Sequence, residues 1–98
     1  MNYAFHPDAL QEYLDGASRY ATINPCLAEA FVLDAERAIE RIIEHPHAWP
    51  AIENDIRHCL LKRFPFAIYY IVEEGTVTIY AFMHTSREPE YWRGRIAP

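Results

Sequence analysis

The sequence is poor in cysteine and has no long hydrophobic run. Its two cysteines, Cys26 and Cys59, stand far apart, so neither a CxxC pair nor a disulfide framework is present. Isolated thiols are typical of cytosolic proteins, and we expect each one to be a small hydrophobic residue rather than a nucleophile. The apolar runs are shorter than the roughly 18 residues that a membrane-spanning helix needs. Residues 1–10 also lack the basic and apolar regions of a signal peptide. We therefore expect a cytoplasmic protein with no membrane partner.

Glycine is also scarce, and its scarcity excludes several kinds of chemistry. The three glycines, Gly16, Gly75 and Gly94, are too dispersed to form a glycine-rich phosphate loop, and the GxSxG and HExxH motifs are missing. Five histidines are present, but their spacing does not match that of a metal site. We therefore expect neither a cofactor nor a metal ion.

The composition nevertheless predicts a folded protein. The 98 residues suit a single domain spanning residues 1–98, and 51% apolar with 14% aromatic residues can fill a thin core. The net charge is −5, and it is unevenly distributed. Ten acidic and three basic residues occur up to Asp55, whereas four acidic and six basic residues follow from Ile56 onward. Only the second half can therefore offer a basic surface, which disfavours a protein that binds nucleic acid through its overall charge.

The first half of the sequence predicts a strand and two helices. Asn2–His6 is a candidate strand that ends at a proline. Apolar residues then recur at helical spacing over Asp8–Thr22, including Leu10, Tyr13 and Leu14 on the expected inner face. Asn24 and a following proline begin a second helix that runs to Glu44 and buries a stripe of its own. Because so short a link joins them, the helices must form an antiparallel hairpin.

The second half predicts a sheet. We assign His45–Asp55 to a loop and Glu74-Gly75 to a tight turn. Three strands are expected, at Arg57–Phe64, Phe66–Glu73 and Thr76–His84. They would form an antiparallel meander, and Glu88–Arg95 would add a short C-terminal helix. The predicted fold is therefore α+β, of order β-α-α-β-β-β, with the helical hairpin packed on an antiparallel sheet.

Alternation along Thr76–His84 assigns the two faces of that sheet. Val77, Ile79, Ala81 and Met83 form the more strictly apolar face, so we expect this face to lie under the helices. The opposite face would then expose rings from two neighbouring strands. Its predicted members are Tyr69, Ile71, Tyr80 and Phe82. Exposed apolar patches of this kind mark interaction sites, although a covering segment of the same chain is an alternative.

One cluster of residues suggests chemistry at the end of the sheet. Its members are Lys62, Arg63, His84, Arg87 and Tyr91. The first and third strands of a meander run in the same direction, so these residues are expected to converge at one end. A metal-free ribonuclease needs a general base, a general acid and cations for phosphate, and these residue types can fill those roles. Ordinary solvated side chains are the alternative.

Four segments together resemble the RelE/ParE superfamily, the toxins of type II toxin–antitoxin (plasmid stabilisation) modules. They are Phe5–Ala9, Ile42–Pro46, Ile56–Tyr70 and Met83–Trp92, and the most specific parts read KRFPFAIYY and HTSREPEYW. The resemblance covers essentially the whole chain. It implies a helical hairpin on an antiparallel sheet, and a cognate antitoxin that masks the functional face of the toxin. A homodimer, or a heterotetramer with the antitoxin, is the assembly that we expect.

The superfamily has two kinds of target, and the resemblance leaves both open. ParE-like members bind DNA gyrase, whereas RelE-like members cleave mRNA on the ribosome without a metal. The nuclease branch carries a cation where this chain has Ala67, and this departure favours the ParE-like, non-enzymatic interpretation. If the chain is an mRNA endonuclease instead, the resemblance implies catalysis by Arg63, His84, Arg87 and Tyr91. A non-toxic member that only binds a partner is the third hypothesis. The predicted partner-binding residues are Lys62, Arg63, Tyr69, Ile71, Tyr80, Phe82 and Trp92.

Overall fold

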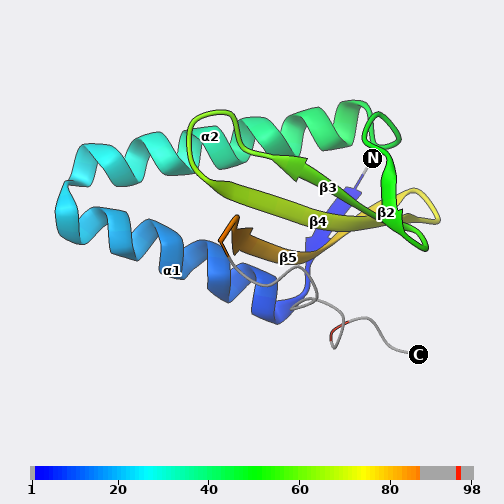
Figure 1. Cartoon of the computed structure of the whole chain (residues 1–98), viewed down its shortest axis with the longest axis horizontal. Coiled ribbons are helices and arrows are strands. Elements are labelled where there is room, and N and C mark those ends of the chain that lie inside the picture. Colours follow the sequence, from blue (N-terminus) through cyan, green and yellow to red (C-terminus); the bar gives the residue numbers. More distant parts are fainter. Residues whose placement is uncertain (1, 87–94, 96–98) are drawn as a thin grey trace.

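Two helices and a five-stranded sheet make up the fold, which a computed structural model describes for residues 2–86 and for residue 95 (Figure 1). The elements are β1 (Asn2–Phe5), α1 (Pro7–Ile23), α2 (Pro25–Glu44), β2 (Ala51–Glu53), β3 (Ile56–Leu60), β4 (Phe66–Glu73) and β5 (Thr76–His84). The strand order in the sheet is β1-β5-β4-β3-β2. The predicted α+β order and the antiparallel β3-β4-β5 meander are confirmed.

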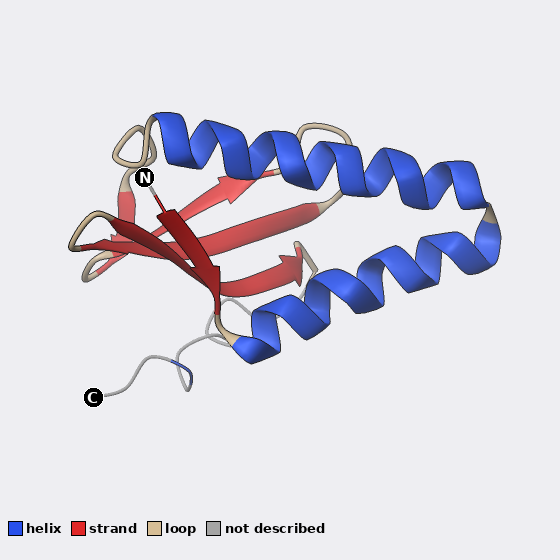
Figure 2. Ribbon diagram, turned by 180° about the vertical axis from the view of Figure 1, so that it is seen from behind, coloured by secondary structure: helices blue, strands red, loops and turns tan. Residues whose placement is uncertain are grey.

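A side-chain cap begins each helix of the hairpin. The His6 Nδ1 accepts a hydrogen bond from the Asp8 N–H at 3.1 Å, and Asn24 Oδ1 accepts one from the Cys26 N–H at 2.8 Å. A proline follows each cap at the first helical position, where a missing N–H costs nothing. Only Asn24 separates the helices, which diverge from their shared turn (Figure 2).

Aromatic rings fill the space between the helices and the sheet. Phe31 of α2 lies at the centre of this cluster and is fully buried. Its ring centroid lies within 6.0 Å of five other rings, those of Tyr13, Tyr20, Phe64, Phe66 and Phe82. Gly16 of α1 makes room for this ring, because a Cβ atom there would approach Phe31 Cζ to 2.9 Å. The core is therefore held by rings that fit one another closely.

Strand β5 changes face in its middle, and this corrects the predicted assignment. Ile79 pairs with Tyr70 and Ala81 pairs with Tyr69, so Tyr80 is an extra residue in β5. A bulge of this kind places two successive side chains on the same side and shifts the alternation beyond it. Val77 and Ile79 lie under the helices as predicted, but Ala81 and Met83 join a cluster on the opposite face. Phe82 moves to the helix side and is 1% exposed, so its predicted place on the open face is wrong.

Other differences concern the edges of the sheet. The segment predicted as a loop contains β2, which pairs with β3, and β3 ends at Leu60 rather than at Phe64. Strand β1 pairs in parallel with β5, so the sheet is mixed rather than purely antiparallel. The predicted C-terminal helix, 88–95, lies outside the described residues except for Arg95. Within the described part of the chain, no helix is long and apolar enough to cross a membrane.

Candidate partner-binding surfaces

The face of the sheet opposite the helices carries a small apolar cluster, which we call the outer cluster. Its buried members are Ile56, Ile71, Ala81 and Met83, and Tyr69 and Tyr80 pack against them half-buried. Tyr69 stacks on His58 with ring centroids 5.5 Å apart, and burial raises the pKa of its hydroxyl. Ile71 is only 8% exposed. Of the four residues predicted for this face, Tyr69 and Tyr80 are therefore the two that offer accessible ring surface.

A rigid loop carries the two predicted cations at one end of the sheet. Asp34 in α2 is 5% exposed, and its Oδ2 accepts hydrogen bonds from the Arg63 N–H at 2.8 Å and the Phe64 N–H at 3.0 Å. The Phe64 ring packs against Tyr20, with centroids 5.0 Å apart. Lys62 and Arg63 are themselves exposed. The loop thus holds two positive side chains in solvent on an anchored backbone.

The end of β5 lies beside the loop between β3 and β4 that carries Lys62 and Arg63, which we call the basic loop, as the meander predicts. His84 pairs with Phe66, and the Thr85 N–H donates to the Pro65 carbonyl at 2.8 Å. The His84 side chain is exposed, and its Nδ1 lies 2.7 Å from Ser86 Oγ. The structure therefore brings Arg63 and His84 to the same end of the sheet. The other predicted residues of this region, Arg87, Tyr91 and Trp92, lie outside the described residues.

The helices present an apolar surface that the sequence reasoning did not identify. Leu10 and Leu14 of α1 are exposed rather than on the inner face, which corrects the prediction for them. On α2, Val32 and Leu33 are exposed beside a shallow hollow. Ala28, Glu29, Val32, Leu33 and Glu36 line this hollow. The sequence did contain a signal for this surface. A helix packed on one side buries only a stripe of its residues, so helices with more apolar residues than one stripe holds must expose some of them.

The described residues contain no cluster of three or more histidine, cysteine, aspartate or glutamate side chains placed to hold a metal ion. The two thiols also lie in different environments. Cys26 is exposed, whereas Cys59 is buried and burial raises the pKa of its thiol. A high thiol pKa leaves little of the reactive thiolate at neutral pH, so Cys59 is a core residue.

Comparisons with known proteins agree with this geometry. A family model described as the ParE toxin of the type II toxin–antitoxin system parDE matches residues 3–89. A solved structure titled as the chromosomal ParDE toxin–antitoxin system from P. aeruginosa superposes with a TM-score of 0.74 at 18% sequence identity. That alignment covers 86% of this chain and 95% of the other chain, and at such low identity it shows a shared fold. No curated protein matches the sequence.

Proposed function

Since the chain belongs to the ParE toxin family of type II toxin–antitoxin systems, we propose that a cognate antitoxin neutralises it in the cytoplasm and that it acts by binding a protein, DNA gyrase. The family match supports the toxin class. The apolar face of the sheet supports a binding mechanism, and this is the observation that carries the proposal.

The described strand residues of that face include none of the cations that RNA cleavage requires. In β3, β4 and β5, the residues on that face are Ile56, His58, Leu60, Ala67, Tyr69, Ile71, Glu73, Thr76, Thr78, Tyr80, Ala81 and Met83. None of these described residues is a lysine or an arginine, and Ala67 is buried against its pair partner Met83. A transition state with negative charge on phosphate needs positive charge aimed at it. This part of the surface suits a protein partner better than a scissile phosphate.

Two surfaces carry the predicted contacts. The half-exposed rings of Tyr69 and Tyr80 suit the antitoxin, because interfaces are usually anchored by a few aromatic side chains. The anchored loop with Lys62 and Arg63 suits an acidic surface of the target, since opposite charges speed encounter and fix orientation. Ile71 contributes apolar support from beneath rather than a direct contact.

An in vitro supercoiling assay tests the target. Purified protein should block supercoiling by DNA gyrase, and it should leave protein synthesis in a translating extract unaffected. Inhibited translation with uninhibited gyrase would overturn the gyrase assignment. Induced expression without growth arrest would instead favour a member that only binds its partner.

Variants of the basic loop test how the target is bound. Replacing both Lys62 and Arg63 with alanine should reduce gyrase inhibition by roughly tenfold or more, because it removes two charges from the contact. The matched control replaces two exposed arginines of the helices, Arg19 and Arg37, with alanine. Equal losses in the loop variant and the control would show that only overall charge matters.

A second function, ribosome-dependent mRNA cleavage, is favoured by one observation. Arg63 and His84 lie at the same end of the sheet, where a cation and a proton-transfer group could act together. If the chain cleaves mRNA, His84→Ala and Arg63→Ala should each abolish cleavage in a translating extract while the fold is preserved. Unchanged cleavage in both variants would eliminate this mechanism.

A further inference from the structure

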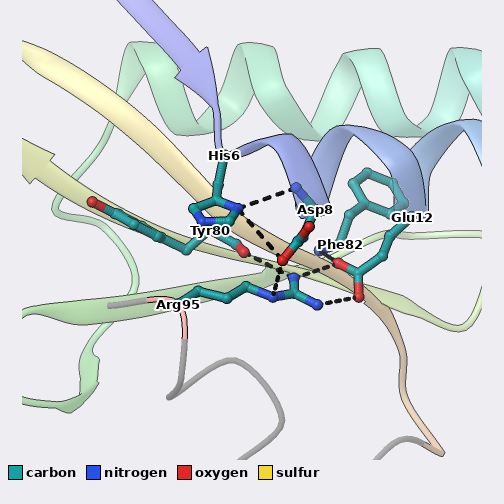
Figure 3. Close-up of polar contacts among 6 residues, drawn as sticks. All are labelled: His6, Asp8, Glu12, Tyr80, Phe82 and Arg95. Atoms are coloured by element: carbon teal, nitrogen blue, oxygen red, sulfur yellow. Dashed lines mark hydrogen bonds and ion pairs between the residues drawn. The ribbon is translucent and has the colours of Figure 1, made fainter. Parts of the chain in front are cut away.

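A guanidinium group is bound at the outer edge of β5, and the chain itself supplies it. Figure 3 shows Arg95 lying against the start of α1, with Asp8 and Glu12 on one side and the backbone of β5 on the other. Glu12 holds the guanidinium through both oxygens: Oε1 accepts from Nη1 at 2.7 Å and Oε2 accepts from Nη2 at 2.8 Å. The Tyr80 carbonyl accepts from Nη1 at 3.0 Å, and Asp8 Oδ2 lies 3.7 Å from Nε. The Arg95 side chain is 9% exposed.

This contact covers a part of the sheet edge that β1 leaves open. Pairing between β1 and β5 ends at Phe5 and Ile79, and the His6 N–H closes it by donating to the Ile79 carbonyl at 2.8 Å. Just beyond this point, Arg95 binds the Tyr80 carbonyl and Glu12 Oε1 accepts the Phe82 N–H at 3.0 Å. Side chains thus take the place of a neighbouring strand. Unpaired strand edges are templates for other chains, and charged side chains are a common way to block them.

The geometry selects a guanidinium and not simply a positive charge. The two parallel contacts with Glu12 need the planar fork of an arginine, which an ammonium group cannot reproduce. The site also retains negative charge when it is filled, since two carboxylates face one guanidinium. Asp8 is 63% exposed, so a second side chain can approach from solvent on that side.

We propose that Glu12, Asp8 and the Tyr80 carbonyl form an arginine-binding site, and that its resident Arg95 keeps the β5 edge closed until an arginine side chain of the antitoxin replaces it. The exchange rests on the proposed function, in which an antitoxin binds this chain. Because Arg95 belongs to the same chain as the site, it competes at a high effective concentration. An arginine of the antitoxin can therefore replace it only when other contacts hold the antitoxin in place. The bound Arg95 thereby favours an extended cognate partner over a free amino acid.

Chemical rescue in the full-length Arg95→Ala variant tests the site without an antitoxin. Hydrogen exchange of the Phe82 amide should become about tenfold faster in this variant, because Glu12 loses the partner that positions it. Added ethylguanidinium should restore the slow exchange, and ethylammonium should not. In a double variant that also carries Glu12→Gln, ethylguanidinium should have no effect. If Arg95→Ala does not fold, Arg95→Lys provides the same comparison with the charge retained.

A competition experiment tests the exchange. N-acetyl-argininamide should bind the Arg95→Ala variant at least about tenfold more tightly than the unmodified chain, in which the tethered Arg95 competes. N-acetyl-lysinamide should bind neither chain measurably. Equal affinity for both amides, equal affinity of both chains, or unchanged Phe82 exchange in Arg95→Ala would each overturn the inference. None of these measurements depends on toxicity or on gyrase, so their failure leaves the proposed function standing.

Discussion

The two faces of the sheet are built from different kinds of side chain. Under the helices, the large rings of Tyr70 and Phe82 are almost completely buried, and Phe82 contacts Phe31 of α2. On the opposite face, the buried members of the outer cluster have no rings, and Tyr69 and Tyr80 are half-exposed at its surface. Large buried rings contribute most to stability, whereas half-exposed rings are available for a partner. Stability and binding are therefore expected to separate between the two faces.

The largest expected effect comes from removing one ring from each face of the sheet, that of Phe82 on the helix side and that of Tyr80 on the opposite side. Phe82→Ala should lower the free energy of unfolding by about 3–5 kcal/mol, because it leaves a cavity between Tyr13 and Phe31. Tyr80→Ala should cost no more than about 1 kcal/mol, and it should weaken antitoxin binding. Urea unfolding and titration with the antitoxin measure the two quantities. Similar losses of stability in both variants would show that the faces are not distinct.

The same bulge explains which part of the fold could be read from the sequence. The limits of α2, β4 and β5 follow from Asn24, the prolines and the turn at Glu74-Gly75, which are local signals. The change of face at Tyr80 has no such signal, because both alternating sets of β5 are apolar enough to be buried. Packing decides between them, since the Phe82 ring fills the space beside Tyr13 with centroids 4.8 Å apart.

The candidate site divides in the same way. Lys62, Arg63 and His84 lie at the same end of the sheet, as the ordinary geometry of a meander predicts. The contact of Arg95 with Glu12 joins residues 83 positions apart in the sequence, and no local pattern predicts a contact of that range. The exposed leucines of α1 were misplaced because helical spacing shows that a stripe exists without showing how wide it is.

Asp34 provides the next largest effect, since it ties the helix side of the fold to the basic loop. Asp34→Ala should lower the free energy of unfolding by about 2–3 kcal/mol, because the Arg63 and Phe64 N–H groups lose a charged acceptor. Asp34→Asn keeps an acceptor oxygen and should cost less. Target binding should fall in the alanine variant even under conditions where it is folded, because the loop is no longer anchored. If folded Asp34→Ala binds the target as well as the unmodified chain does, anchoring of the basic loop is not needed for target binding.

Removing the Tyr70 hydroxyl tests the stability of the helix side with a smaller expected effect. Its hydroxyl donates to the Pro46 carbonyl at 2.7 Å, so Tyr70→Phe should cost about 1 kcal/mol at neutral pH. Burial raises the pKa of Tyr70 from 10.0 to about 12. Between these values the unfolded chain loses the proton while the folded chain keeps it, so stability should fall as the pH rises from about 10 to about 12. Tyr70→Phe should make this fall shallower in urea unfolding at a series of pH values, and an identical fall would assign it to other groups.

The smallest effect is expected at the turn between β4 and β5, which belongs to neither face. Glu74 has φ 49° and Gly75 has φ 76°, a pair of left-handed residues that suits Asn-Gly better than Glu-Gly. Glu74→Asn should therefore raise the free energy of unfolding by about 0.5 kcal/mol, and Gly75→Ala should lower it by about 1 kcal/mol. A Cβ atom at Gly75 would meet nothing within 4 Å, so the second change acts through the backbone alone. Because the turn lies outside both clusters, neither variant should alter antitoxin binding, and a change in affinity would extend the binding surface to this end of the sheet.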